Sequence, residues 1–417
     1  MGTPSAEEIK ELIRTRLTPA YAEWRRCRSL AELQAHPLYR ELEPVIAAVL
    51  DTVETADFRT EAPPAKDSYR IVAWNIERGA RFAEQLEIFE RHPHISAADV
   101  LLLIETDDGM ARSGNRNVAR DFARALGFSY AFAPCYLSLV KGSGLEYHTD
   151  GENEIGLHGN AVLSRYPIRS TRLIRLKNGR DKMAGREKRI GSQAALAAEI
   201  ELPQGCLTAV AVHLDAQSSQ RHRVEQMRDI LDHLPAGGPA VLGGDWNTST
   251  YNSSHAFYAI CGFWLRVLMG TSYVIPNHYL RPESFFERRL FRLLESRGFD
   301  YRSANVIGER TTWYDMGDDA PVQNLREWVP HWCFPFIHWA LRNHDNKCPF
   351  KLDWFAVRGL RAANPAVWHE VREGRVVPLS DHDAISVDVR FATPPKLNNG
   401  PCDAALTSSS GQGGVSV

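Results

Sequence analysis

The chain has 417 residues, of which 44% are hydrophobic and 24% are charged, close to the averages of folded, water-soluble proteins. This composition allows a sizeable core and excludes wholesale disorder. With 49 Lys and Arg against 51 Asp and Glu, the formal net charge is -2. A global positive field for nucleic acid is therefore excluded, and any attraction to a polyanion must come from a local patch.

Cysteine usage and hydropathy bear on the compartment. The seven cysteines are odd in number and scattered, unlike a secreted disulfide framework, which favours a reducing compartment. No apolar stretch follows the first twelve residues, and the longest apolar run, Phe257 to Leu265, is far shorter than the roughly 20 residues of a bilayer span. We therefore expect a cytoplasmic protein with no integral membrane span. The oligomeric state stays open.

The N-terminal region is helical in character. Apolar residues at helical spacing predict two or three helices from Ser5 to about Asp57, and Ser5 with Glu8 forms a capping box. A Pro-containing linker ends at Lys66. Residues 1–66 are thus expected to form a helical appendage and linker, and without a basic excess this appendage fits a structural brace better than a nucleic-acid arm.

After Lys66 short β-like runs alternate with helical stretches. Several runs are joined by turns rather than helices, which favours an α/β fold with mixed sheets. The tail, residues 393–417, is rich in Pro, Gly, Ser and Asn and is expected to be disordered. The predicted strands are Tyr69–Trp74, Val100–Ile104, Ala161–Ser164, Ala194–Ile200, Leu207–Val212, Ala240–Leu242, Leu352–Val357 and Ala384–Val389, and the predicted helices include Phe82–Phe89, Val118–Leu126 and Arg221–Leu234.

Polar residues cluster near the ends of these strands, where open α/β sheets place their ligands. Taken singly, an Asn or Asp at such a position is more often a turn or a helix cap. Their order and combination outweigh that interpretation. The five segments are Ala73-Trp74-Asn75-Ile76-Glu77, Leu103-Ile104-Glu105-Thr106, Gly243-Gly244-Asp245-Trp246-Asn247, Lys351-Leu352-Asp353-Trp354-Phe355 and Leu379-Ser380-Asp381-His382-Asp383.

Together these segments resemble the endonuclease/exonuclease/phosphatase superfamily of metal-dependent phosphoesterases, which includes deoxyribonuclease I, apurinic endonucleases, inositol-polyphosphate 5-phosphatases and neutral sphingomyelinases. The family pattern of W-N, Q-E, G-D-x-N, D-Y/W-F and S-D-H occurs in order between about Tyr69 and Phe391. Ile104 departs from it, because Gln is usual there and supports the metal carboxylate. The resemblance implies a four-layer α/β sandwich of two mixed β-sheets flanked by helices over residues 67–392, with an aromatic-rich insert at about 250–348.

Hydrolysis of a phosphodiester needs a cation on the phosphate, a positioned water and stabilisation of the departing oxygen. Oxygen-only ligands favour Mg²⁺ or Mn²⁺. We expect Glu105 to be the leading metal ligand, with Asn75 beside it. Asp381 is expected to supply a further carboxylate to the same cation or to a second one.

The resemblance implies roles for the remaining motif residues. Asp245 would orient and deprotonate the attacking water, and Asn247 would hold that water or a phosphate oxygen. A protonated His382 would donate to the transition state, fixed by a hydrogen bond to Asp353. His213, at the end of its own predicted strand, would be a second phosphate-binding imidazole.

A further segment, His158 to Pro167, resembles the family's G-N-A-x-L-S-R-Y-P strand and places Asn160 near the phosphate as a substrate-binding residue. Glu77, Asp107 and Arg112 lie close in sequence to the metal ligands. They either shape the pocket or occupy solvated loop positions.

Two segments bear on the substrate. Between Arg165 and Arg189 ten Lys and Arg stand against two acids, which suits nucleic acid, a polyphosphate or an anionic membrane, or else forms a solvated hairpin. The stretch between Asn247 and Asp353 is unusually aromatic. It is interpreted as a subdomain burying its own aromatics in preference to a lid for a base or a lipid.

A zinc site is not favoured, because the candidate spacings match no standard knuckle. Its candidates would be His331, Cys333, His338, His344 and Cys348.

The sequence thus predicts a hydrolase of phosphoric esters, a metal-dependent phosphodiesterase such as a nuclease. The alternatives are a sphingomyelinase-like lipid phosphodiesterase and a sugar or inositol phosphate phosphatase. A non-catalytic binding module is remote, because a decayed site should have lost a metal or water-positioning residue and none is lost.

Overall fold

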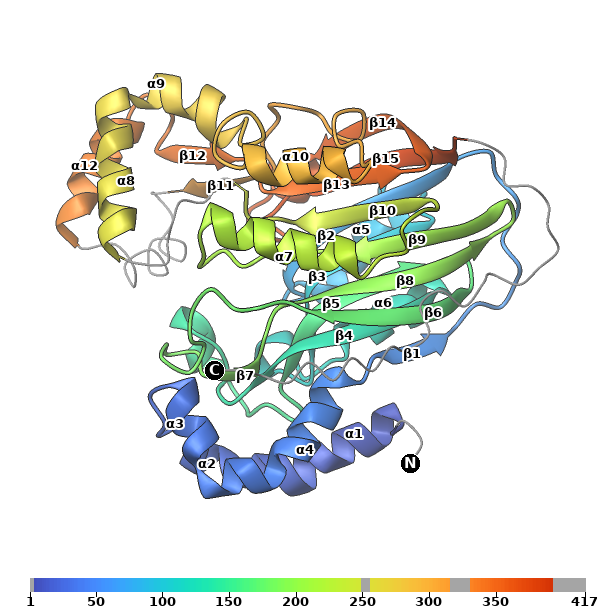
Figure 1. Cartoon of the computed structure of the whole chain (residues 1–417), viewed down its shortest axis with the longest axis vertical. Helices are drawn as coiled ribbons and strands as arrows, with labels where there is room; N and C mark the ends of the chain where they lie inside the picture. The colour runs from blue at the N-terminus through green and yellow to red at the C-terminus, as the bar shows by residue number, and fades with distance from the viewer. Residues whose placement is uncertain (1–3, 249–255, 316–330, 393–417) are drawn as a thin grey trace.

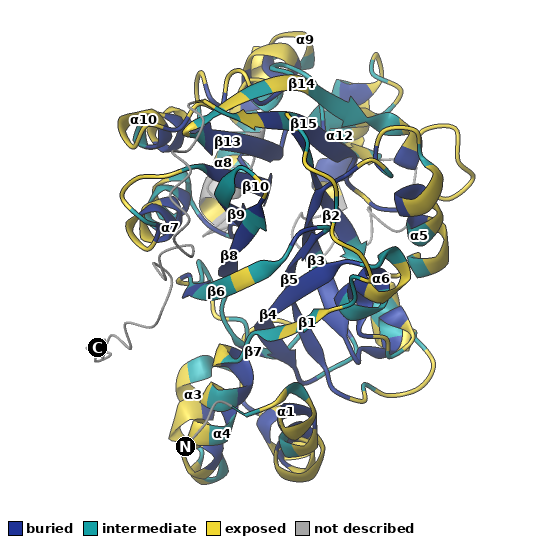
Figure 2. Cartoon of the chain, turned by 90° about the vertical axis from the view of Figure 1, so that its right-hand side faces the viewer, coloured by how far each residue is buried: buried dark blue, intermediate teal, exposed yellow. Residues whose placement is uncertain are grey.

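The computed structural model describes residues 4–248, 256–315 and 331–392. Two mixed β-sheets face each other, and helices cover the outer face of each (Figure 1). The four-layer α/β sandwich expected from the sequence is confirmed. Figure 2 shows the central strands of both sheets as buried, and the edge strands and the outer helices as partly exposed.

The large sheet has eight strands within the described residues, in the order β1-β4-β5-β3-β2-β15-β14, with β7 paired to β4. Its central strands β2 and β3 are parallel. The strands are β1 (Glu54–Asp57), β2 (Tyr69–Arg78), β3 (Val100–Asp108), β4 (Ser129–Ser138), β5 (Leu157–Ser164), β7 (Arg189–Gly191), β14 (Leu360–Trp368) and β15 (Ala384–Phe391).

The small sheet has the order β13-β10-β9-β8-β6, and a separate two-stranded sheet pairs β11 with β12. All eight strands predicted from the sequence are present, with shifted ends. The strands of the small sheets are β6 (Ile168–Arg175), β8 (Ala194–Leu202), β9 (Gly205–Ala211), β10 (Ala240–Asp245), β11 (Thr312–Asp315), β12 (Lys347–Phe350) and β13 (Asp353–Arg358).

The helices form the two outer layers and one projection. The three helices predicted between the strands correspond to α5, α6 and α7. The α-helices of the described residues are α1 (Ala6–Leu12), α2 (Tyr21–Trp24), α3 (Leu30–Ala35), α4 (Pro37–Asp51), α5 (Phe82–Arg91), α6 (Val118–Leu126), α7 (Gln220–Asp232), α8 (Ala256–Met269), α9 (Thr271–Val274), α10 (Arg288–Ser296) and α12 (Phe334–Leu341).

The core follows from the two-residue alternation of strands. In β2, Ile71 and Ala73 point between the two sheets, where they join side chains of the small sheet such as Val241. Val72 and Trp74 point the other way and pack under α1 to α6. On the far side, α7 and α10 cover the small sheet through one apolar cluster. These apolar clusters fix the two sheets relative to each other. The polar side chains at the strand ends lie outside the clusters and can form the site.

The N-terminal helices pack on the outer face of the large sheet. Ile46 and Val49 of α4 are buried in the same apolar cluster as that face of the sheet. The expectation of helix up to about Asp57 is wrong at its end, because Glu54–Asp57 forms β1, an edge strand that pairs with β4. The separate status of residues 1–66 stays a prediction.

The aromatic insert divides into two parts. Its α10 belongs to the layer on the small sheet, whereas α8, α9 and α12 project from the body (Figure 1). Phe291 and Phe334 are buried as expected, but Trp332, Phe336 and Trp339 are exposed. The expectation that the insert buries its own aromatics is therefore wrong for these three side chains of the projecting part, although Phe334 of α12 is buried.

No helix within the described ranges is long and apolar enough to cross a bilayer. The predicted disorder of residues 393–417 concerns a segment outside the described residues.

Candidate active site

The site begins with two strands of the small sheet. β10 and β13 are antiparallel, and their register pairs Asp245 directly with Asp353. Gly244 precedes Asp245 with a φ of +136°, and a Cβ at this glycine would lie 2.3 Å from the carbonyl oxygen of Val212. Only glycine fits this close approach of β10 to the segment that carries His213.

The large sheet contributes two strand ends that are bent by bulges. The register of β2 with β3 shifts after Asn75, and that of β3 with β5 shifts after Leu103. Glu105 adopts a φ of +58°, in the left-handed region that side chains other than glycine rarely occupy. Such bulges redirect side chains. Asn75 and Glu105 meet, with Asn75 Nδ2 donating to Glu105 Oε1 at 3.3 Å.

Both sheets converge at Asn75. Its Nδ2 lies 3.3 Å from Asp245 Oδ2 as well as from Glu105. The side chain of Asn75 is almost completely buried. An amide on the large sheet therefore bridges the predicted metal carboxylate and the predicted base.

His382 completes the cluster. Its Nδ1 donates to Asp353 Oδ2 at 2.8 Å, and its Nε2 lies 3.6 Å from Asp245 Oδ2. Trp74 Nε1 donates to the carbonyl oxygen of His382 at 2.9 Å. Ser380 Oγ donates to the carbonyl oxygen of Asn75 at 2.6 Å. The Ser380-Asp381-His382 segment is thus tied to the end of β2.

The cluster favours a charged imidazole beside a protonatable carboxylate. Burial opposes the charge of His382, but Asp353, Asp245 and Asp381 outweigh it and raise the pKa of His382 well above its ordinary value. Burial raises the pKa of Asp245 to about 7, with Asp353 adding to the effect and His382 opposing it. A base with a pKa near neutrality and a cationic donor therefore lie side by side.

His213 has the opposite character. Its Nε2 lies 3.7 Å from Asp245 Oδ2 and 3.9 Å from Glu105 Oε1. Burial lowers the pKa of His213 to about 4, so the imidazole is neutral at pH 7. The structure brings His213 to the site, as a neutral hydrogen-bonding group rather than a second cation.

Glu105 stays ionised in the site. Burial opposes its charge, but Arg78, together with charged imidazoles such as His382, outweighs burial and holds the pKa of Glu105 below its usual range. Arg78 lies 3.8 Å from Glu105 and also pairs with Glu146 at 3.0 Å. Neither Arg78 nor Glu146 was predicted from the sequence.

Asp381 lies at the exposed mouth of the site. Burial and the charge of Asp381 raise the pKa of Glu77 to about 7, with a further contribution from Glu105. Like-charged carboxylates in one place call for a cation. Glu105, Asn75 and Asp381 offer only oxygen ligands to such a cation, so the residues present fit Mg²⁺ or Mn²⁺.

By distance, Asp245, Asp353 and His382 also form a group of metal-ligand type, with their donor atoms within 4.8 Å of one another. Within this group, however, His382 has a raised pKa and its Nδ1 donates a hydrogen bond to Asp353. A protonated imidazole has no lone pair for a metal. The Glu105 side of the site therefore suits a cation better.

Two residues that were predicted to contact the phosphate or the attacking water form hydrogen bonds within the protein. Asn160 Nδ2 donates to the carbonyl oxygen of Ala194 at 2.8 Å, and its Oδ1 accepts from the backbone N–H of Glu105 at 3.3 Å. Asn247 Nδ2 donates to the carbonyl oxygen of Leu214 at 2.9 Å. Asn160 thus holds the strained backbone of Glu105.

Ile104, the departure from the family pattern, is fully buried between the sheets. It contacts no part of the carboxylate cluster through a polar atom, because its side chain has none. The bulge at Glu105 and the hydrogen bond from Asn160 supply the positioning instead.

Asp107 and Arg112 are buried and form a bidentate pair at 2.8 and 3.0 Å. His158 Nδ1 lies 2.8 Å from Asp107 Oδ1. Arg112 also reaches Glu187 at 3.1 Å. This network of ion pairs and hydrogen bonds stabilises the segment that follows Glu105. The interpretation of Asp107 and Arg112 as solvated loop residues is therefore wrong.

The basic segment between Arg165 and Arg189 largely supports the fold. Arg165 donates to the carbonyl oxygens of Ala98 and Ser96 at 2.7 Å, and Lys182 pairs with Asp215 at 3.2 Å. Several of its cations are therefore engaged in internal contacts. No three of Cys333, His338, His344 and Cys348 come together as metal ligands within the described residues.

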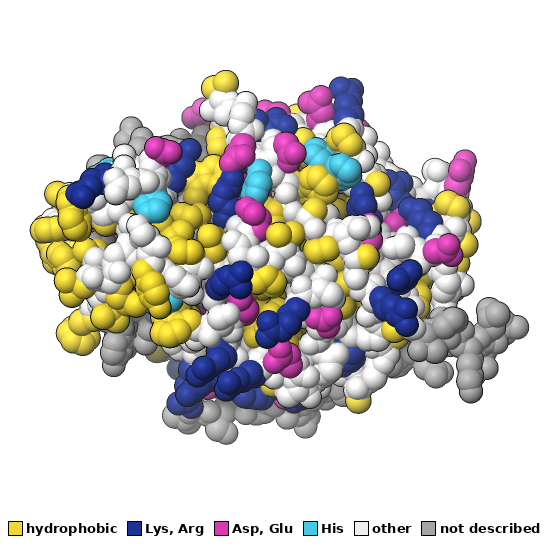
Figure 3. All heavy atoms as spheres, turned by 90° about the horizontal axis from the view of Figure 1, so that it is seen from above, with side chains coloured by type: hydrophobic (Ala, Val, Ile, Leu, Met, Phe, Trp, Pro, Cys, Tyr) yellow, Lys and Arg dark blue, Asp and Glu magenta, His cyan; other side chains and the backbone are white. Residues whose placement is uncertain are grey.

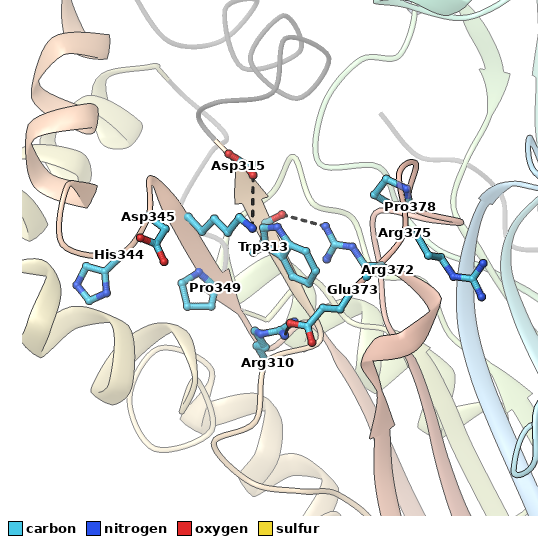
Figure 4. A pocket seen from close by; sticks show the side chains of 12 residues that line it. Arg310, Trp313, Asp315, His344, Asp345, Pro349, Arg372, Glu373, Arg375 and Pro378 are labelled. Atoms are coloured by element: carbon cyan, nitrogen blue, oxygen red, sulfur yellow. Dashed lines mark hydrogen bonds and ion pairs between the residues drawn. The ribbon is translucent and has the colours of Figure 1, made fainter.

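A pocket of about 550 Å³ is lined by residues of β11, of β12 and of the segment 372–378 (Figure 4). Trp313 lies at its centre, with the guanidinium of Arg372 3.4 Å and that of Arg310 4.4 Å from the ring centre. Arg372 Nη2 donates to the carbonyl oxygen of Trp313 at 3.3 Å. The preceding residue, Thr312, donates through its hydroxyl to the carbonyl oxygen of Asp381, which links the pocket to the catalytic segment.

The two facing mixed sheets, with a carboxylate, amide and imidazole cluster at their strand ends, define the deoxyribonuclease I-like fold. The chain belongs to the endonuclease/exonuclease/phosphatase family, whose model matches residues 72–382. Members of this family are hydrolases acting on phosphoester bonds.

The chain is also similar to individual known proteins. The uncharacterized protein YbhP of Escherichia coli strain K12 is 27% identical over 174 residues, which cover 40% of this chain and 62% of YbhP. An endonuclease/exonuclease/phosphatase from Beutenbergia cavernae is 16% identical, covering 79% of this chain and 73% of that chain with a TM-score of 0.47. The human Nocturnin catalytic domain is 15% identical, covering 82% and 97%, with a TM-score of 0.43.

Proposed function

We propose that this chain hydrolyses a phosphodiester with the help of a bound divalent cation. The observation that carries the proposal is the meeting of two sheets at one cluster: Asp245 beside charged His382 on one side, and ionised Glu105 with Asn75 on the other. Neither half alone suits phosphoester chemistry. Together they provide a base, a proton donor and a cation site within one buried group of side chains.

Three side chains of the cluster act on the attacking water and on the phosphate. Asp245, with a pKa of about 7, takes a proton from the attacking water, since a base is most effective when its pKa is near the working pH. Protonated His382 donates through Nε2 to charge on the phosphate oxygens, and Asp353 fixes its ring through Nδ1. Neutral His213 offers a second hydrogen bond.

Glu105, Asn75 and Asp381 would hold the cation, which supplies charge neutralisation to the phosphate when bound. Asn160 acts as a positioning residue by fixing the backbone of Glu105. Asn247 closes the turn after β10, because its backbone N–H donates to Asp245 Oδ1 at 2.9 Å and aims that carboxylate.

The test is a screen of purified full-length protein against plasmid DNA, RNA, sphingomyelin and phosphorylated sugars, with Mg²⁺ or Mn²⁺ added and then removed by EDTA. We expect hydrolysis of at least one phosphodiester that stops with EDTA. A clean, metal-loaded preparation that cleaves no phosphoester would overturn the proposal in favour of a binding module.

The particular phosphoester that serves as substrate is a separate proposal, which depends on the one above. A phosphomonoester of a sugar or inositol is an alternative, and a lipid phosphodiester is favoured by the exposed aromatic projection. The cytoplasmic location predicted from the cysteine pattern also stays a prediction.

A further inference from the structure

The projecting helices α8, α9 and α12 expose a large apolar surface. We call this surface the apolar tip. Its side chains are exposed far beyond what a folded core residue shows. They are Leu265 (61% exposed), Leu268 (82%), Tyr273 (52%), Trp332 (53%), Phe336 (43%) and Trp339 (54%).

The exposed side chains gather in one region. Figure 3 shows hydrophobic atoms covering the end of the molecule at which Figure 1 places α8 and α12. The rings of Trp264 and Trp332 are stacked 6.0 Å apart, and the Phe336 ring lies 5.0 Å from Trp264, so α8 and the start of α12 form one surface. Contiguous apolar patches of this kind mark interaction sites.

The composition of the tip suits the boundary of a lipid bilayer. From Ala256 to Leu280 and from His331 to His344 the sequence contains no Asp or Glu. Trp and Tyr are the residues that prefer the headgroup level. The guanidinium of Arg342 lies 4.9 Å from the ring centre of Trp339, which places a cation beside an interfacial aromatic. An apolar, cationic tip complements an anionic lipid surface.

The tip is joined to the catalytic edge of the sandwich at both ends. α8 begins soon after Asp245 and Asn247, and β12, which follows α12, ends just before Asp353. Lys347 of β12 lines the Trp313 pocket together with Arg310 and Arg372. Arg310 is already paired with Glu373 and Asp383, and Lys347 lies 3.8 Å from Asp315, so these two cations have carboxylate partners within or beside the pocket.

Arg372 strengthens this interpretation. Its side chain is more than nine-tenths buried, its Nε has no hydrogen-bond partner, and it forms no ion pair with a carboxylate within the described residues. A buried guanidinium without an ion-pair partner is costly. A lipid phosphate in the pocket would supply the missing anion.

We propose that the apolar tip docks on the surface of a phospholipid bilayer and that the adjoining pocket receives the phosphate of a lipid headgroup. The phosphate held in this pocket is a docking contact and not the scissile group, because the pocket is not lined by Asp245, His382 or Glu105. The catalytic site would then face membrane phospholipid, and the identification of a second, neighbouring lipid phosphodiester as the substrate rests on the proposed function. A second copy of the chain is a poorer occupant, because two tips packed about a twofold axis would bring their arginines together with no acid on the tip to balance them.

Docking is tested by sedimentation of the full-length chain with phosphatidylcholine vesicles, with and without an anionic phospholipid. We expect the wild type to pellet with vesicles, more so with the anionic lipid. The variant Leu268→Glu with Trp339→Glu should bind roughly tenfold or more weakly, because each change removes an exposed apolar group and adds a repelled charge. Both positions are largely exposed, so folding should be unaffected.

The matched control is Ala35→Glu with Ala47→Glu, which adds the same two charges at exposed positions of α3 and α4, away from the tip. This control should pellet like the wild type. Wild type that remains in the supernatant with both vesicle types overturns the proposal, as does a double variant that pellets equally well. Light scattering that shows a wild-type dimer broken by the double variant, without vesicle binding, would assign the tip to self-association instead.

Hydrolysis of bis(p-nitrophenyl) phosphate, which needs no membrane, separates docking from catalysis. The double variant should retain wild-type activity on it. Vesicle binding without any hydrolysis would overturn the proposed function and leave docking intact. Hydrolysis without vesicle binding would overturn the docking proposal and leave the proposed function intact.

Discussion

Asp245 and Asp353 face each other as a register pair of the antiparallel strands β10 and β13. Two carboxylates in this position destabilise a sheet unless a cation lies between them. The imidazole of His382 meets that need, with Nδ1 on Asp353 at 2.8 Å and Nε2 3.6 Å from Asp245. The pair therefore both stabilises a charged imidazole and keeps the pKa of Asp245 near 7.

Asp353→Asn should lower kcat by about 10²–10⁴-fold, because His382 loses the carboxylate that orients its ring and favours its charged form. The measurement is steady-state hydrolysis of bis(p-nitrophenyl) phosphate at saturating metal. KM should change much less than kcat, since Asp353 does not contact substrate. Asp232→Asn, at an exposed position of α7, is the control; a kcat equal to wild type in both variants would contradict the role of Asp353.

Glu105→Gln should abolish stabilisation by divalent metal. Binding of Mg²⁺ or Mn²⁺ at 100 times its Kd stabilises the native state by about 2.7 kcal/mol, which raises Tm. Thermal melts of wild type with and without Mn²⁺ should show this shift, and EDTA should reverse it. Glu87→Gln, an exposed helix position, should keep the shift. An unchanged shift in Glu105→Gln would move the cation site elsewhere.

Arg223 and Glu287 join α7 to the segment before α10 through a completely buried ion pair at 2.5 Å. Arg223→Met should lower the free energy of unfolding by about 3–5 kcal/mol, because it leaves a buried carboxylate without its partner. Arg223→Met combined with Glu287→Leu should lower it far less. Urea unfolding of the four proteins gives the comparison, and strictly additive losses would contradict this account.

Glu187 makes stability depend on pH. Burial opposes its ionisation, but Arg189 and Arg112 outweigh burial and lower the pKa of Glu187 from 4.5 to about 2. Because the folded pKa is depressed, the contribution of up to about 3 kcal/mol is present above pH 4.5 and is lost as the pH falls toward 2.

Glu187→Gln should therefore show a flatter dependence of unfolding free energy on pH over that interval than the wild type. Denaturant unfolding at a series of acidic pH values measures it. Parallel curves for the two proteins would show that Glu187 has an ordinary pKa.

Much of the fold was predictable because its signals are local. The alternation in β2, with Ile71 inward and Trp74 outward, is legible in the sequence. β4 and β14 escaped prediction because each contains a proline, and the structure accommodates it with a bulge next to Pro134 and next to Pro365. Proline inside a run usually argues against a strand.

The candidate site was predictable as a set of residues but not as a geometry. Asn75, Glu105, Asp245 and His382 meet as expected. The left-handed backbone of Glu105 comes from a β-bulge, and no pattern in the neighbouring sequence predicts that bulge. Arg78 and Glu146 pair across distant segments, and whether aromatic helices such as α12 are covered depends on tertiary partners rather than on their sequence.

The central claim is that Asp245 activates water for metal-dependent phosphodiester hydrolysis. The most direct measurement is the rate of bis(p-nitrophenyl) phosphate hydrolysis by wild type and Asp245→Asn, each saturated with Mn²⁺ and each shown by circular dichroism to be folded. The account predicts EDTA-sensitive turnover by the wild type and a loss of about 10²-fold or more in the variant. Equal rates in the two proteins, or wild-type turnover that survives EDTA, would contradict it.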